Sequence, residues 1–139
     1  WSSLYRKMIP PLSKVGRVIA PDLLGFGKSD KPTERNDYSF TMHLESLRQF
    51  VEQLDLRRVT LVCQDWGGLL GLTLATQLAD RFARLVIMNT FLPTGEEKPS
   101  AGFLAWRAFA ERIDDMDVGR IIQGATVSDL PDNVVAAYD

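Results

Sequence analysis

The sequence predicts an α/β fold in which a parallel sheet is flanked by helices, and two features of the chain lead to this prediction. Short continuous apolar runs occur at residues 17–20, 59–63 and 85–88, with the length and composition of strands that are buried on both faces. Segments with helical patterning separate these runs. Alternating strands and helices of this kind build a parallel sheet.

Two helices and one structured loop are expected between the strands. Residues 40–54 repeat leucine or valine every three or four positions, which is typical of an amphipathic helix, and Ser39 or Thr41 is a suitable cap. Residues 68–79 are apolar on most sides, so we expect a largely buried helix. Residues 22–32 carry the glycines, aspartates and proline of a structured loop.

The character of the chain changes after the third predicted strand. Residues 93–102 (PTGEEKPSAG) are predicted as a loop or linker, and residues 102–139 as helical and more polar. This shift indicates an insertion that leaves the sheet. The chain starts at Trp1 and stops within the helix-rich region, so we expect an internal fragment of a longer protein.

Composition excludes several classes of function. The 139 residues carry a net charge of -2, which gives no reason to expect a nucleic-acid partner, and no apolar stretch is long enough to span a membrane. A single cysteine, Cys63, and a single histidine, His43, argue against a disulfide or a metal site, and we expect no cofactor. The GFGKS stretch lacks the first glycine of a phosphate-binding loop, because that position is Asp22.

The stretch Cys-Gln-Asp-Trp-Gly-Gly stands between the second predicted strand and the following helix. A polar residue on such a turn, with small residues two positions away on either side, is the nucleophile-elbow pattern of α/β-hydrolases. Cys63 and Gly67 flank Asp65 in this way, and Gly68 follows; a strained turn requires small neighbours. A carboxylate is ionised at neutral pH and can displace a leaving group from a tetrahedral carbon, forming an ester. The plainer alternative is that Asp65 only caps the helix.

The segment VCQDWGGLLGLTL, with RVIAPDLLGFGKSDKP before it and RLVIMNT after it, closely resembles the haloalkane dehalogenases. The resemblance covers nearly the whole chain. It implies a partial α/β-hydrolase fold, with residues 1–92 as the N-terminal part of the core and residues 93–139 as the beginning of an incomplete helical cap. It also implies hydrolysis of a small apolar haloalkane to a primary alcohol and a halide ion. Asp65 would be the nucleophile, water the only cosubstrate, and an aspartyl alkyl ester the intermediate.

The resemblance implies roles for four further residues. The indole N–H of Trp66 would bind the departing halide, and its backbone N–H would help to form the oxyanion hole. The stretch Gly-Phe-Leu-Ala-Trp matches a cap segment of the family, which gives Trp106 the role of second halide donor and Phe103 that of an apolar wall. Leu69, just after the elbow, would line the substrate pocket. The alternative for Trp106 is a core aromatic of an amphipathic helix.

The remaining catalytic parts are expected outside these 139 residues. In the family a histidine and the acid that orients it follow the nucleophile, whereas His43 precedes Asp65 and is expected to be a surface or half-buried residue. The oxyanion loop is expected before Trp1. We therefore expect the isolated chain to be inactive. No signal peptide is visible in these residues, and we expect the whole protein to be cytoplasmic.

Two other functions fit parts of the sequence. An epoxide hydrolase would form the same ester on Asp65, but it needs cap tyrosines, and residues 93–139 offer only Tyr138. Such enzymes also usually carry histidine where this chain has Gln64. The second alternative is a non-catalytic binding protein with an α/β-hydrolase fold.

Overall fold

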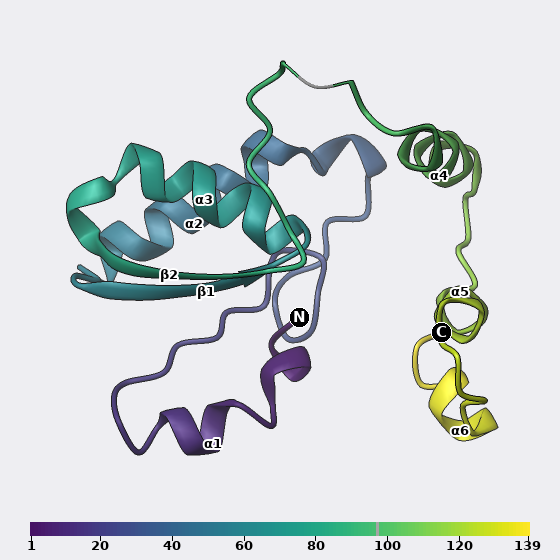
Figure 1. Cartoon of the computed structure of the whole chain (residues 1–139), viewed down its shortest axis with the longest axis horizontal. Coiled ribbons are helices and arrows are strands. Elements are labelled where there is room, and N and C mark those ends of the chain that lie inside the picture. The colour runs from purple at the N-terminus through teal and green to yellow at the C-terminus, as the bar shows by residue number, and fades with distance from the viewer. Residues whose placement is uncertain (97) are drawn as a thin grey trace. The chain divides into compact units, whose positions relative to one another are not determined.

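The computed structural model describes residues 1–96 and 98–139, and these form two compact units (Figure 1). The first unit, Trp1–Pro93, contains a parallel sheet with helices packed on it. The second unit, Thr94–Asp139, is built from helices in its described part.

The sheet of the first unit consists of β1 (Val59–Gln64) and β2 (Phe82–Met88), which run parallel. The crossover between them is α3 (Trp66–Gln77), followed by the short turn η3 (Ala79–Arg81). Gln64 lies opposite Met88, so both strands end at the same edge of the sheet. The predicted strands at residues 59–63 and 85–88, and the helix between them, are thereby confirmed.

The core of the first unit lies where the crossover helix meets the sheet and α2 (Phe40–Gln53). Figure 1 shows α3 against the sheet with α2 beside it, in agreement with the contacts between these elements. The buried apolar residues come from all three elements: Val51, Cys63, Leu70, Leu72 and Leu74. Full burial of a leucine stabilises a fold by about 1.5–3 kcal/mol, so α3 contributes most of this core.

The helix α2 confirms the predicted amphipathic helix and its cap. The Ser39 hydroxyl accepts a hydrogen bond from the Met42 backbone N–H at 3.1 Å. At the other end, Asp55 has a left-handed backbone conformation with φ of 43°, which is a common way to end a helix. The Asp55 carboxylate then pairs with Arg81 at 2.9 Å, which connects the end of α2 to the start of β2.

The predicted strand at residues 17–20 is wrong. These residues have no regular secondary structure, although Val18, Ile19 and Ala20 are half-buried as their apolar character requires. A strand exists only as a member of a hydrogen-bonded ladder. Within the described residues the sheet contains β1 and β2 alone, so this apolar run has no ladder to join.

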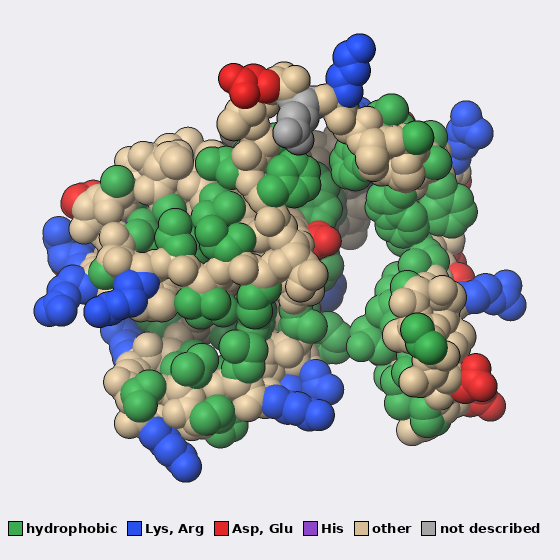
Figure 2. All heavy atoms as spheres, in the orientation of Figure 1, with side chains coloured by type: hydrophobic (Ala, Val, Ile, Leu, Met, Phe, Trp, Pro, Cys, Tyr) green, Lys and Arg blue, Asp and Glu red, His purple; other side chains and the backbone are tan. Residues whose placement is uncertain are grey.

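The prediction that the strands are buried on both faces is also wrong. Cys63 is the one buried residue of β1, and the central residues of β2 are exposed, among them Leu85, Val86 and Ile87. Figure 2 shows hydrophobic side chains at the surface of the first unit. The reason is that α3 covers one side of a sheet that has only two strands in the described part of the chain.

The loop at residues 22–32 is structured, as predicted, and it is organised around one carboxylate. Asp22 accepts hydrogen bonds from the backbone N–H groups of Lys28 at 2.9 Å and Ser2 at 2.7 Å. These bonds stabilise the ionised form, and the pKa of Asp22 is lowered to about 2, chiefly by the Lys28 bond. Gly27 has φ of 52°, and a side chain there would overlap the Asp22 carboxylate. The loop therefore requires glycine for both conformation and space.

Short helical turns complete the first unit, and helices of 4 to 12 residues make up the described part of the second. The turns are η1 (Ser2–Tyr5), α1 (Ile9–Leu12) and η2 (Arg35–Asp37). The second unit contains α4 (Ala101–Arg112), α5 (Val118–Ala125) and α6 (Asp132–Val135), which confirms the predicted helical character of this region. Of the helices in the described residues, none combines the length and the apolar character that a membrane crossing needs.

Candidate active site

Asp65 occupies the sharp turn between the end of β1 and the start of α3. Its backbone angles are φ 48° and ψ −127°, which place a residue with a side chain in a region that favours glycine. A conformation of this kind costs on the order of 1–3 kcal/mol and persists only where the surrounding structure imposes it. The strained turn predicted for the elbow is therefore confirmed at Asp65.

A comparison with other caps in the same chain tests the alternative that Asp65 is only a helix cap. Ser39, Ser100 and Asp117 cap their helices in the ordinary way, with negative φ and a hydrogen bond from the backbone N–H of the third helical residue. The Asp65 carboxylate instead accepts from the N–H of Trp66, the very next residue, at 2.6 Å. Asp65 thus differs from these caps in both backbone conformation and bonding, and capping alone does not explain its strain.

The two oxygens of the Asp65 carboxylate have different surroundings. Oδ1 accepts the Trp66 N–H, whereas Oδ2 accepts no hydrogen bond from the residues that the structure describes. The side chain is exposed, and it lies at the N-terminus of the 12-residue helix α3, where the helix dipole favours an anion. One oxygen is held in place and the other is open, an arrangement that suits attack on an electrophilic carbon.

The two glycines after Trp66 have different structural roles. At Gly68, an added Cβ would overlap the side chain of Thr90, so this position requires glycine for space. At Gly67, no described atom lies within 4 Å of the corresponding position. The prediction that the turn requires small neighbours is confirmed at Gly68, but within the described residues it does not hold at Gly67.

Alanine substitutions at these glycines are expected to have opposite effects on stability. Gly68→Ala must displace Thr90 and is expected to lower the free energy of unfolding by about 1–3 kcal/mol. Gly67→Ala meets open space and reduces the flexibility of the unfolded chain, so it is expected to be neutral or stabilising by up to about 1 kcal/mol. Chemical denaturation of the whole protein that carries this chain measures both. Equal costs at the two positions would contradict this account of the elbow.

The first turn of α3 presents two predicted site residues next to Asp65. Trp66 is the first residue of the helix, and 59% of its surface is exposed. Leu69 is half-buried and lies three positions later, on the same face of the helix. Within the first unit, the structure thus brings together Asp65, Trp66 and Leu69.

The other two predicted site residues lie in the second unit, on α4. Phe103 and Trp106 are spaced three positions apart on this helix and are 50% and 46% exposed. The Trp106 ring contacts Phe109 with their centroids 5.7 Å apart. Trp106 is therefore not a buried core aromatic of its own unit. The role of Trp106 as a second halide donor beside Trp66 involves residues of two units, and it stays a prediction.

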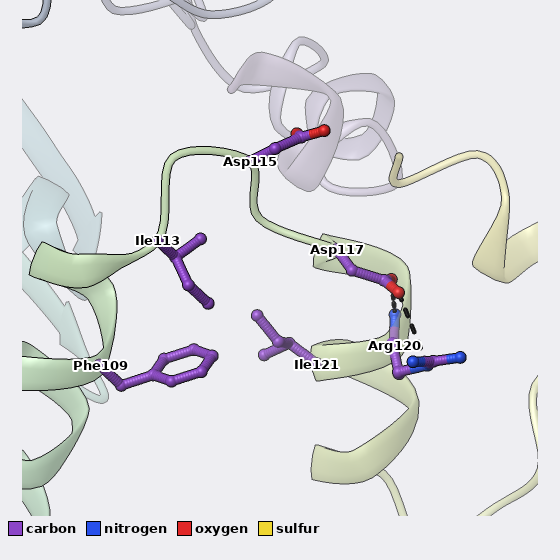
Figure 3. A pocket seen from close by; sticks show the side chains of 6 residues that line it. All are labelled: Phe109, Ile113, Asp115, Asp117, Arg120 and Ile121. Atoms are coloured by element: carbon purple, nitrogen blue, oxygen red, sulfur yellow. Dashed lines mark hydrogen bonds and ion pairs between the residues drawn. The ribbon is translucent and has the colours of Figure 1, made fainter.

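A hollow of about 220 Å³ lies in the second unit, and it involves none of the predicted site residues (Figure 3). Figure 3 shows Phe109, Ile113 and Ile121 directed toward one another. Asp117 caps α5 through the Arg120 backbone N–H and also forms an ion pair with the Arg120 side chain. Asp117 and Arg120 at this hollow thus have structural partners, and the elbow remains the candidate site.

The remaining reactive side chains of the first unit show no sign of activation. His43 is half-buried, as predicted, and burial lowers the pKa of its imidazole. Cys63 is 3% exposed, and burial raises the pKa of its thiol, which disfavours the reactive thiolate. Among the described residues, no group of three or more histidine, cysteine, aspartate or glutamate side chains is arranged to hold a metal ion.

Comparison with known proteins gives a consistent result. A family model described as alpha/beta hydrolase fold matches residues 1–115. The chain is 49% identical over its whole length to a haloalkane dehalogenase of Psychrobacter cryohalolentis and 50% identical to haloalkane dehalogenase 1 of Mycobacterium bovis. It covers 46% and 47% of those two proteins, so it spans about half the length of these relatives.

A solved structure shows the same similarity in three dimensions. The tetrameric haloalkane dehalogenase DpaA from Paraglaciecola agarilytica NO2 matches all of the chain with a TM-score of 0.87 and 45% sequence identity, over 46% of its own length. The strained aspartate between β1 and α3 and the family match over residues 1–115 lead to one conclusion. The chain belongs to the α/β-hydrolase family, and its sequence is similar to haloalkane dehalogenases along its whole length.

Proposed function

We propose that the whole protein carrying this chain is a haloalkane dehalogenase, which converts a haloalkane and water to a primary alcohol and a halide ion. The observation that supports this most strongly is the conformation of Asp65, an exposed carboxylate on a strained turn that ordinary capping does not explain. The similarity to haloalkane dehalogenases supports the choice of reaction. The residues 1–92 would belong to the catalytic core and residues 93–139 to the cap.

In the first step, Oδ2 of Asp65 attacks the carbon that bears the halogen. A lone pair of the carboxylate forms the new C–O bond, and the electron pair of the carbon–halogen bond leaves with the halide. The indole N–H groups of Trp66 and Trp106 would donate hydrogen bonds to the departing halide. Indole nitrogen is a donor only, so it stabilises negative charge without a competing lone pair.

In the second step, water cleaves the ester. The water oxygen attacks the carboxyl carbon of the Asp65 ester, and the ester carbonyl oxygen takes up negative charge. The Trp66 backbone N–H, which holds Oδ1 at 2.6 Å, is positioned to donate to this oxyanion. A histidine outside these 139 residues would accept a proton from the attacking water. One of the two protons of the water leaves with the alcohol, the other is released to solvent, and the carboxylate is restored.

The substrate is proposed to be a small apolar halogenated alkane. Leu69 and Phe103 have only apolar side-chain atoms to offer, so they suit a wall that excludes water from the alkyl group. Haloalkane and water give the alcohol, the halide ion and one proton, so the reaction balances with water as the only cosubstrate, and it uses no metal and no cofactor. A cytoplasmic location is also part of the proposal.

Product analysis of the purified whole protein tests the proposal. With a primary bromoalkane, equal amounts of bromide and the primary alcohol are expected over many turnovers, whereas an alkyl epoxide is expected to give no diol. Diol formation without bromide release would instead identify an epoxide hydrolase. Binding of the bromoalkane with no product from either compound would identify a binding protein.

A further inference from the structure

Thr90 lies just after β2 and makes two contacts with the elbow, 25 residues earlier in the chain. Its hydroxyl donates a hydrogen bond to the backbone carbonyl of Asp65 at 2.8 Å. Its side chain also fills the space that a Cβ on Gly68 would need. One threonine therefore contacts the strained residue through a hydrogen bond and the first turn of α3 through packing.

The fold explains why these residues meet. β1 and β2 are parallel and pair regularly from Thr60 onward, with Gln64 opposite Met88, so the next residues of both strands emerge at one edge of the sheet. Asn89 has a left-handed backbone conformation with φ of 44°, so the chain turns sharply immediately before Thr90. The branched side chain of threonine restricts rotation about its first torsion, which favours a fixed hydroxyl position.

The hydrogen bond acts on the group whose orientation defines the strained turn. The Asp65 carbonyl accepts from the backbone N–H groups of Gly68 at 2.9 Å and Leu69 at 3.3 Å, and from the Thr90 hydroxyl. The first two bonds belong to the helix itself and would form in an ordinary helix start as well. The Thr90 bond comes from the segment just after β2 and ties the carbonyl to the end of that strand.

We propose that Thr90 is a positioning residue, which holds the Asp65 backbone in its left-handed conformation and thereby aims the carboxylate. For catalysis this inference rests on the proposed function. Thr90→Val removes the donor and keeps the shape, and Thr90→Ser keeps the donor and removes a methyl group. If the hydroxyl group positions Asp65, Thr90→Ser keeps this positioning and Thr90→Val abolishes it. If packing of the Thr90 side chain positions Asp65, Thr90→Val keeps the positioning and Thr90→Ser weakens it.

Two measurements on the whole protein test the proposal. In the NMR spectrum, the carbonyl carbon of Asp65 is expected to shift upfield in Thr90→Val and to stay near its original position in Thr90→Ser, because a hydrogen bond to the oxygen deshields that carbon. The second measurement is the rate of bromide release, normalised to the amount of folded protein. Thr90→Val is expected to lower kcat roughly two- to tenfold, which corresponds to the net free energy of one hydrogen bond. KM is expected to change less, since Thr90 would not touch the substrate. Thr90→Ser is expected to keep most of the activity.

The outcomes separate this inference from the proposed function. An unchanged Asp65 carbonyl shift in Thr90→Val overturns the positioning role, whatever the activity of the protein. A shifted carbonyl with an unchanged kcat means that the bond exists but does not aim the carboxylate, which also overturns the proposal and leaves the dehalogenase assignment intact. If the unaltered protein releases no bromide, the proposed function fails, and the carbonyl shift still decides whether Thr90 holds the backbone of Asp65.

Discussion

Asp65→Ala in the whole protein is expected to lower bromide release from a primary bromoalkane by at least about ten-thousandfold, the scale on which enzymes lose activity when a catalytic nucleophile is removed. No second carboxylate is available at this turn, because the neighbouring residues are Gln64 and Trp66. The measurement is the initial rate of bromide release at saturating substrate. A loss of only a few fold would show that Asp65 is a helix cap.

A matched variant at the same position separates chemistry from folding. Asp65→Gly also removes the carboxylate, but glycine adopts the φ of 48° without strain. This variant is expected to be as inactive as Asp65→Ala and more stable than it by about 1 kcal/mol in chemical denaturation. An inactive and well-folded Asp65→Gly variant excludes unfolding as the cause of the loss.

Trp106→Phe is expected to lower turnover by about a hundredfold, because it keeps the aromatic ring and deletes the N–H that would stabilise the halide. Halide affinity of the free protein, followed by tryptophan fluorescence, should weaken in parallel. Phe109→Leu is the matched control, since Phe109 is the aromatic neighbour of Trp106 at 5.7 Å and has no donor to lose. If both variants lose only stability and keep their halide affinity, Trp106 serves in packing alone.

The elements around the elbow were predictable because local patterns determine them. Periodic apolar residues and the Ser39 cap define α2, and an apolar β-branched run followed by a turn and an apolar helix defines β1, Asp65 and α3. The strain at Asp65 follows from a strand that ends and a helix that begins with this one residue between them. Such signals lie within a few positions of one another in the sequence.

The features that the sequence did not reveal depend on distant partners. Residues 17–20 have strand composition, but whether they pair depends on a neighbouring strand. The exposure of Leu85 and Ile87 likewise depends on what covers the sheet. Thr90 was missed as part of the elbow because a threonine 25 residues away carries no local signal. The parallel register of β1 and β2 could have pointed to it, because it brings the residues after both strands to one edge.

The central claim is that the Asp65 carboxylate becomes covalently bonded to the alkyl group, and an isotope experiment tests it most directly. The whole protein is allowed to turn over a bromoalkane in water labelled with the heavy oxygen isotope, and the peptide that contains Asp65 is then analysed by mass spectrometry. Hydrolysis of an ester places a water oxygen on the carboxyl carbon, so heavy oxygen is expected in Asp65 after turnover and not in protein kept without substrate. If the alcohol carries the heavy label from the first turnover and Asp65 carries none, water attacks the substrate directly and the covalent mechanism is wrong.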